Sequence, residues 1–196
     1  SELSRAKTDK ADAKLIARYA LQADLIAWKP LPANIRTLQA LTRRVEHLLE
    51  MQRMEQNRLE TADSTITPSI KTVLSTLDTE LKATRQAIHD HIDNDPDLKQ
   101  QSDLLLSIPG IGPATITYLL VALSPHHGYA NAKQVVAQAG LAPAIAQSGQ
   151  WQGKTRIAKT GDARLRKALY LPALVAWQHN PAIRRQCERL KANGKN

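Results

Sequence analysis

Residues 34–61, NIRTLQALTRRVEHLLEMQRMEQNRLET, carry the pattern that decides the fold. Their apolar residues recur at helical spacing on one face, and Arg, Glu and Gln fill most of the remaining positions. The residues on the apolar face are Ile35, Leu38, Val45, Leu48, Leu49 and Leu59. The stretch therefore predicts one long amphipathic helix.

A second long helix is predicted between a break at residues 61–68 and the stop signal Asn94-Asp95-Pro96. Residues at near-heptad spacing within it are Ile66, Ile70, Val73, Leu77, Leu81, Thr84, Ile88 and Ile92. Two long helices joined in this way form an antiparallel hairpin or part of a coiled coil. Because a lone hairpin has nothing wide enough to cover its apolar stripe, we expect residues 34–93 to self-associate into a dimer or tetramer.

The segments on either side of this predicted hairpin are also helical in pattern. Residues 7–27 show a helical recurrence that is opened by Thr8 or Asp9 as N-cap and ended by Pro30 and Pro32. Residues 99–196 are interrupted by glycines and prolines, which predicts a compact helical domain with functional loops. With 4% aromatic residues and no Phe, the core must be aliphatic, and the predicted fold class is mainly α.

Composition indicates a soluble, folded protein. An apolar content of 42% argues against disorder, and the single Cys187 excludes an intramolecular disulfide framework and fits a reducing cytosol. There is no signal peptide and no run of about 18 apolar residues, so we expect a cytoplasmic protein without membrane contact. The first residue is Ser and the segment after it resembles the inside of a domain, so we expect a piece of a longer protein.

Charge is concentrated in the C-terminal half. Residues 104–196 hold 12 Lys or Arg against 2 acidic residues, whereas residues 1–103 hold 15 against 16, within a net charge of +9. A basic surface on one half only predicts a polyanionic partner, with a merely soluble basic face as the alternative.

The first motif with chemical meaning is LLLSIPGIGPATITYLL at residues 104–120. Glycines between two helices let the backbone turn so that successive N–H groups point outward at the next helix's N-terminus, a geometry that binds phosphate. The motif resembles a helix-hairpin-helix element, which grips the nucleic-acid backbone, and the alternative is a plain helix corner in the core. The predicted contacts are Pro109, Gly110, Ile111 and Gly112.

The second motif surrounds Ser148 in residues 140–169. A hydroxyl ringed by cations suits attack on a phosphodiester, because the cations hold the phosphate and offset the charge that develops on it. A Ser-Gly in a loop is otherwise a simple turn. The predicted DNA contacts around it are Gly149, Lys154, Arg156, Lys159, Arg164, Arg166 and Lys167.

Charged and aromatic residues in and after this motif give three further expectations. Arg164 and Lys167 share a helical face, which predicts a cationic ridge on a buried helix. Trp151 is expected either to stack on a base or to act as a hydrophobic anchor. Trp177 is expected to fill the core.

A third motif is Asp9 and Asp12, three residues apart in KTDKADA. Carboxylates at this spacing lie on one helical face and can share Mg²⁺, a hard cation that prefers oxygen ligands. Two acids do not complete such a site, so the alternative is an N-cap on a solvated face.

Taken together, these segments resemble the bacterial transposases of the insertion sequence 110 family, relatives of the Piv-type DNA invertases. The resemblance lies in SIPGIGPATI, then YANAKQVVAQAGLAP, then SGQWQGKTRIAKTGDARLRKAL, and it covers nearly the whole chain. The residues that carry it are Pro109, Gly110, Gly112, Gly140, Leu141, Pro143, Ser148, Gly149, Arg156, Lys159, Gly161, Leu165 and Arg166.

The resemblance implies a mechanism and a domain plan. The family's RNase-H-type (resolvase-like) domain has four acidic residues, of which the last two correspond to Asp9 and Asp12 and bind Mg²⁺, and the serine corresponding to Ser148 bonds covalently to DNA. Residues 1–30 would then be the last helix of that domain, 34–98 the oligomerising hairpin and 99–196 the transposase domain. A structured guide RNA and a homo-oligomer are also implied.

Three functions remain open at this stage. The first is a transposase that uses Ser148, for which residues 1–196 alone would fold and bind nucleic acid but not recombine DNA, since the other two acids are missing. The second is a non-catalytic helix-hairpin-helix module that binds nucleic acid and tolerates Ser148→Ala. The third is a coiled-coil adaptor, which leaves the basic Ser-Gly region without a use.

Overall fold

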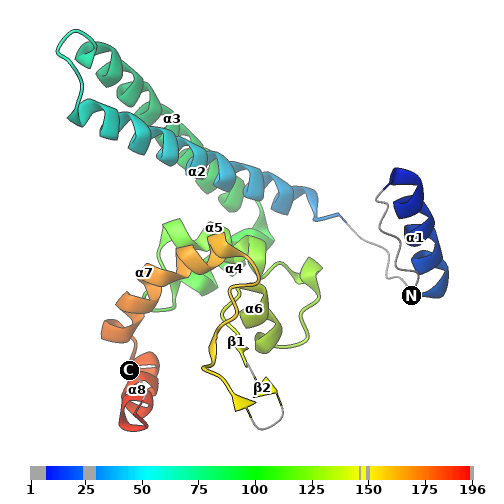
Figure 1. Ribbon diagram of the computed structural model, residues 1–196. Coiled ribbons are helices and arrows are strands. Elements are labelled where there is room, and N and C mark those ends of the chain that lie inside the picture. The colour runs from blue at the N-terminus through cyan, green and yellow to red at the C-terminus, as the bar shows by residue number, and fades with distance from the viewer. Residues whose placement is uncertain (1–7, 24–29, 146, 149–150, 195–196) are drawn as a thin grey trace. The chain divides into compact units, whose positions relative to one another are not determined.

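The computed structural model describes residues 8–23, 30–145, 147–148 and 151–194. These residues form eight α-helices, one 3-10 turn and four two-residue strands (Figure 1). The mainly α fold expected from the aliphatic composition is therefore confirmed. The chain divides into two compact units, Ser1–Leu31 and Pro32–Asn196. Within the described residues, no helix is both long enough and apolar enough to span a membrane.

The first unit contains helix α1 (Asp9–Gln22). Its N-cap is Thr8, whose hydroxyl oxygen accepts a hydrogen bond from the Ala11 amide at 3.3 Å. Of the two N-caps predicted from the sequence, Thr8 and Asp9, the structure therefore has Thr8. No residue of α1 is buried. Residues 7 and 24–27 of the predicted helix lie outside the described part of the chain.

Helices α2 (Ala33–Glu60) and α3 (Thr67–Asp93) run antiparallel along one another as a hairpin (Figure 1). Leu48, Leu77 and Leu81 are buried between them. Two helices cover only a narrow seam of each other, so three residues predicted to share the apolar stripe remain accessible. These are Leu49, Ile66 and Val73, with 41%, 52% and 42% of their surface exposed.

Helices α4 (Pro96–Leu106) and α5 (Pro113–Ala122) lie at the end of the hairpin where α2 begins and α3 ends. Helix α5 packs against both α2 and α7 (Ala163–His179). Part of the stripe on α2 is therefore covered within the chain rather than by a second copy, and self-association of residues 34–93 stays a prediction.

The loop expected around Ser148 contains short strands. After the 3-10 turn η1 (Pro125–His127) and helix α6 (Ala132–Gln138), the chain forms β1 (Pro143–Ala144), β2 (Gln147–Ser148), β3 (Trp151–Gln152) and β4 (Arg156–Ile157). Strand β1 pairs antiparallel with β4, and β2 pairs antiparallel with β3. We call residues 143–157 the serine arm.

The last two helices, α7 and α8 (Pro181–Ala192), correct two sequence-based expectations. Helix α7 is not a buried helix, because only Leu165 and Pro172 are buried in it. Trp177 does not fill the core: 42% of its surface is exposed, and the Lys191 ammonium lies 4.9 Å from its ring centroid. A cation–π contact on the surface takes the place of the expected core packing.

Candidate functional site

Ser148 lies on the second strand of the serine arm. Its backbone pairs with Trp151 of β3, and the side chain is exposed. Within the described residues, nothing hydrogen-bonds its hydroxyl. Gly149, predicted as a DNA contact, lies outside the described residues, and the side chain of Trp151 is not described. A ligand that reaches the arm therefore meets an accessible hydroxyl.

The cations that follow Ser148 are also exposed. Lys154, Arg156 and Lys159 lie on the returning half of the serine arm and just beyond it. From residue 104 onward, the described lysines and arginines include only one, Arg164, that forms an ion pair with a carboxylate. Because the other described cations form no close ion pair with a carboxylate, their charge is available to an anionic ligand.

The base of the serine arm is fixed to α6. Gly140 ends α6 with a φ of +67°, and the amides of Gly140 and Leu141 donate to the carbonyls of Ala137 and Val136 at 2.9 and 3.0 Å. This is a Schellman cap, whose left-handed residue favours glycine. The Lys159 amide donates back to the Gly140 carbonyl oxygen at 3.0 Å, which closes the base of the arm.

Arg166 of α7 completes this base. Its Nη1 donates to the Ala139 carbonyl at 3.0 Å, and a β-carbon built at Gly140 would lie 2.5 Å from that same nitrogen. The helix itself is capped by Asp162, whose carboxylate accepts from the Arg164 and Leu165 amides at 2.8 and 3.1 Å. The first turn of α7 is thus a rigid support, and the guanidinium of Arg166 is held by it.

Arg164 and Lys167 point from the same turn toward α2. Arg164 Nε lies 3.3 Å from Glu46 Oε2, and the other oxygen of Glu46 accepts from the Tyr118 hydroxyl at 3.0 Å. Burial, together with the bond to Glu46, raises the pKa of Tyr118 to about 12. Lys167 is exposed. Of the two ridge residues, Arg164 is therefore engaged and Lys167 is accessible.

The two glycines of the turn between α4 and α5 differ in their surroundings: one packs against α7 and the other faces open space. Gly110 has a φ of +104° and lies against α7, where a β-carbon would come within 3.0 Å of the Ala176 amide nitrogen. This close approach accounts for glycine there without a ligand. Pro109 is exposed and Ile111 is half-buried.

Gly112 is the residue of this turn that faces open space. It is the N-cap of α5 at a φ of −119°, no side chain caps the helix, and a β-carbon built there would meet nothing within 4 Å. If the turn binds phosphate, it does so at Gly112 and not at Gly110.

Asp9 and Asp12 lie in the first turn of α1 and are exposed. Their oxygens are the ligand type that Mg²⁺ prefers, but octahedral coordination needs more donors than two carboxylates supply. No group of three or more His, Cys, Asp or Glu among the described residues is arranged to hold a metal. The pair therefore supplies ligands of the kind that Mg²⁺ prefers but not a complete site.

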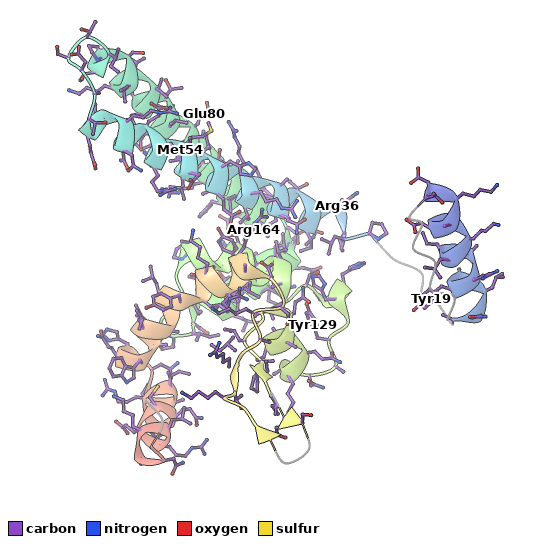
Figure 2. All side chains as sticks on the ribbon, viewed as in Figure 1. Tyr19, Arg36, Met54, Glu80, Tyr129 and Arg164 are labelled. Atoms are coloured by element: carbon purple, nitrogen blue, oxygen red, sulfur yellow. The ribbon has the colours of Figure 1, made fainter. Side chains whose placement is uncertain are left out.

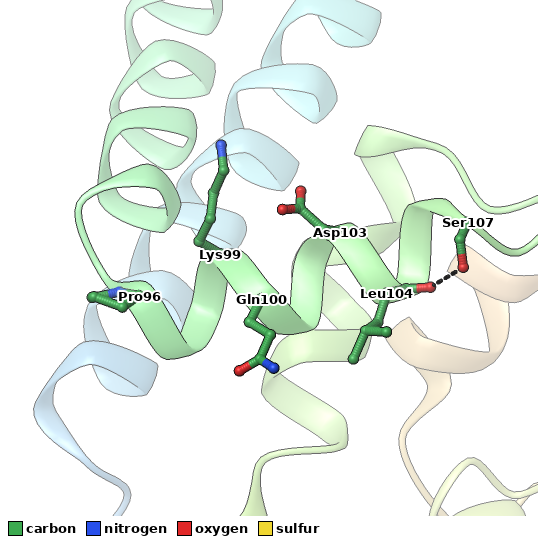
Figure 3. Close-up of a pocket in the computed structure, with 6 residues that line it drawn as sticks. All are labelled: Pro96, Lys99, Gln100, Asp103, Leu104 and Ser107. Carbon is green, nitrogen blue, oxygen red and sulfur yellow. Dashed lines mark hydrogen bonds between the residues drawn. The ribbon is translucent and has the colours of Figure 1, made fainter.

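A hollow along α4 does not compete with the serine arm as a site (Figure 3). Two of its polar side chains are already engaged: Lys99 binds Asp93, and the Ser107 hydroxyl donates to the Leu104 carbonyl at 2.7 Å. The residues that line it are Pro96, Lys99, Gln100, Asp103, Leu104 and Ser107.

Comparison with known proteins identifies the class of this helical, basic chain. Residues 102–188 match the family model described as transposase IS116/IS110/IS902 family, and residues 1–68 match a model of the DEDD transposases of the IS110 type. The chain belongs to the IS110 family of transposases.

Individual relatives agree with this assignment. The pilin gene-inverting proteins of Moraxella bovis and Moraxella lacunata are each 32% identical over 193 residues, which is 97% of this chain and 60% of each relative. The insertion element IS110 43.6 kDa protein of Streptomyces coelicolor is 28% identical over 130 residues, 66% of this chain and 31% of that protein. The chain thus spans about 60% of the length of the pilin gene-inverting proteins it matches.

Two residues of the site were missed by sequence reasoning. Glu46 is one of several acids on α2, and Tyr118 lies in an apolar helix, so neither carries a local signal. They are brought to Arg164 only by the packing of α2, α5 and α7.

Proposed function

We propose that the chain is part of a DNA recombinase in which the hydroxyl of Ser148 attacks a DNA phosphodiester. Ser148 Oγ forms a bond to phosphorus, the bond from phosphorus to one sugar oxygen breaks, and that oxygen leaves with a proton in place of the one the serine gives up. The observation that carries the proposal is the exposed Ser148 hydroxyl on an arm whose cations form no ion pair with any carboxylate in the described part of the chain.

The cations of the arm would stabilise the reaction electrostatically. Lys154, Arg156 and Lys159 are placed on the half of the chain that returns from Ser148. A phosphodiester gains negative charge as the serine attacks, and fixed positive charge beside it lowers the barrier. Membership of a transposase family and the likeness to proteins named for pilin gene inversion support recombination as the reaction.

Magnesium is proposed as the metal of the complete recombinase. Asp9 and Asp12 would supply two of its oxygen ligands. When bound, such an ion neutralises phosphate charge. The role of this chain's own residues is to present the two carboxylates from one face of α1.

The proposed partners are DNA, a structured guide RNA and further copies of the chain. The unpaired cations of the C-terminal half favour a polyanion, and the N-terminus of α5 at Gly112 is the proposed phosphate contact of a helix-hairpin-helix element. The exposed Leu49 and Val73 of the hairpin support a coiled-coil contact between copies. A monomer in light scattering at micromolar concentration would count against that contact.

A second candidate is a non-catalytic nucleic-acid-binding module. It is favoured by the same exposed cations, which need no serine in order to bind a phosphate backbone. The two candidates differ at Ser148, because only the recombinase requires its hydroxyl.

A covalent-trapping assay separates the two candidates. The complete polypeptide that contains this sequence is incubated with labelled donor and target DNA, guide RNA and Mg²⁺ and run on a denaturing gel. We expect a DNA–protein adduct that Ser148→Ala abolishes and that Thr155→Ala, which removes another exposed hydroxyl of the arm, retains. No adduct in the wild type would favour the binding module, and an adduct that persists in Ser148→Ala would mean that another residue is the nucleophile.

A further inference from the structure

We propose that Glu46 is a positioning residue for Ser148: it holds Arg164 and Tyr118, and thereby fixes the turn of α7 on which the serine arm is anchored. This inference rests on the proposed nucleophilic role of Ser148. It also means that Arg164, predicted from the sequence as a DNA contact, is not proposed to contact nucleic acid.

The cluster joins three helices through one carboxylate. Glu46 of α2 accepts from the Tyr118 hydroxyl of α5 at 3.0 Å and pairs with Arg164 Nε of α7 at 3.3 Å. The Glu46 side chain is 25% exposed and that of Arg164 is 50% exposed. Figure 2 shows Arg164 on the side of α7 that faces the hairpin. Both oxygens of the carboxylate are used, one for each neighbouring helix.

The same turn of α7 also contacts the C-terminal end of α6, from which the serine arm extends. Arg166, two residues after Arg164, donates to the Ala139 carbonyl at 3.0 Å. The Asp162 amide donates to the Gln138 carbonyl at 2.7 Å, and Leu165 between the two arginines is 2% exposed. One turn therefore connects α2 to the base of the arm through consecutive short contacts.

The electrostatics distinguish Arg164 from its neighbours. Described cations beyond residue 104 other than Arg164 form no close ion pair with a carboxylate, whereas Arg164 is paired with Glu46. A guanidinium that is already paired releases few counterions when nucleic acid binds, so it adds little to the salt dependence of binding. Arg164 therefore helps to align the serine arm, whereas the unpaired cations contribute to the affinity for nucleic acid.

The test compares Glu46→Gln with Asp78→Asn in the complete polypeptide. Both changes remove one negative charge from the hairpin, but Asp78 pairs with Lys82 of its own helix α3, at 2.7 Å. We expect Glu46→Gln to slow adduct formation at saturating DNA by about tenfold to a hundredfold, as expected for a misplaced reacting group. The dissociation constant for DNA should not rise, since the change removes no positive contact and leaves Arg164 without its carboxylate partner. Asp78→Asn should change neither the rate of adduct formation nor the dissociation constant for DNA.

Three further measurements separate a positioning effect from a loss of folding. Tyr118→Phe removes only the hydroxyl bond to Glu46 and is expected to slow the adduct less than Glu46→Gln does. In an ultraviolet titration of folded protein, the tyrosine that ionises with a pKa of about 12 should titrate at lower pH in Glu46→Gln, because the negative neighbour is gone. A thermal melt confirms that each variant is folded.

The possible outcomes separate the two claims. A wild-type adduct with an unchanged rate in Glu46→Gln overturns the positioning role and leaves the serine nucleophile standing. A loss of DNA affinity in proportion to the loss of rate also overturns it. No adduct in the wild type contradicts the proposed function, and the positioning role with it.

Discussion

Gly110 lies against the backbone of Pro172, where a β-carbon would come within 2.9 Å of the carbonyl oxygen. This contact joins the turn between α4 and α5 to the middle of α7, while Arg166 joins the start of α7 to the C-terminal end of α6, at the base of the serine arm. The two glycine-containing motifs of the sequence therefore converge on one helix. Variants that disturb α7 should affect both.

Gly110→Ala is expected to lower the free energy of unfolding by more than about 2 kcal/mol. The residue has a φ of +104°, which strains any side chain, and the added methyl meets backbone atoms that cannot rotate away. Urea denaturation measures the change. Gly112→Ala is the matched control at a φ of −119° in open space, and it should cost about 1 kcal/mol or less. Equal effects of the two variants would contradict the contact with α7.

Gly112→Asp tests phosphate binding at the N-terminus of α5. The backbone at Gly112 is extended, as an N-cap requires, so Asp and Asn should both cap the helix and keep or raise stability. The carboxylate would repel a phosphate that the amide would tolerate. We expect Gly112→Asp to weaken DNA binding in a titration, with Gly112→Asn near the wild type. Similar affinities for the two variants would leave the turn as a packing corner.

Lys159→Asn is expected to separate stability from affinity. Lys159 has a φ of +57°, a left-handed conformation that Asn adopts more readily than Lys, so stability should hold or rise by up to about 1 kcal/mol. The loss of one phosphate contact should reduce the slope of log K against log salt by about 0.9. Fluorescence titrations at several salt concentrations measure that slope. An unchanged slope would exclude Lys159 from the nucleic-acid interface.

Arg166→Lys is expected to destabilise the base of the serine arm although the charge is kept. Lysine lacks the planar guanidinium that reaches the Ala139 carbonyl, and a hydrogen bond from a charged donor contributes about 1.5–3 kcal/mol. Denaturation gives the loss of stability, and the trapping assay should show slower adduct formation. Arg185→Lys, an exposed change on α8, is the control. If both variants match the wild type, the guanidinium does not support the arm.

Acid should weaken the corner between α3 and α4. The Asn34 amide and the Leu98 and Asp97 backbone amides hold the pKa of Asp95 below its ordinary value of 3.8. A carboxyl with a lowered folded-state pKa stabilises the fold above its unfolded pKa, and this contribution is lost as pH falls through the folded pKa. Stability measured from pH 5 down to about pH 2 should therefore fall less in Asp95→Asn than in the wild type. Parallel curves would contradict the role of Asp95.

Sequence reasoning predicted the helical framework well because its signals are local. The apolar recurrences at 34–61 and 66–93 correspond to α2 and α3, which end within a few residues of the predicted breaks. Thr8 was one of two predicted N-caps of α1, and it accepts the capping bond in the structure. Spacing, caps and proline stops act over one or two turns of chain, so they can be read without tertiary contacts. Charge counting likewise located the basic half, and the Ser148 motif located the candidate site.

The tertiary structure alone decided how the site residues are used. Arg164, Arg166 and Lys167 read alike in sequence, yet Arg164 pairs with Glu46, Arg166 binds a carbonyl and Lys167 is exposed. Gly110 and Gly112 are two residues apart, and one is packed against α7 while the other is open. These differences arise from contacts with segments about 27 to 118 residues away, which local propensity does not encode. The sequence determined which residues are charged or flexible, and only packing between distant helices determined which of them can meet a ligand.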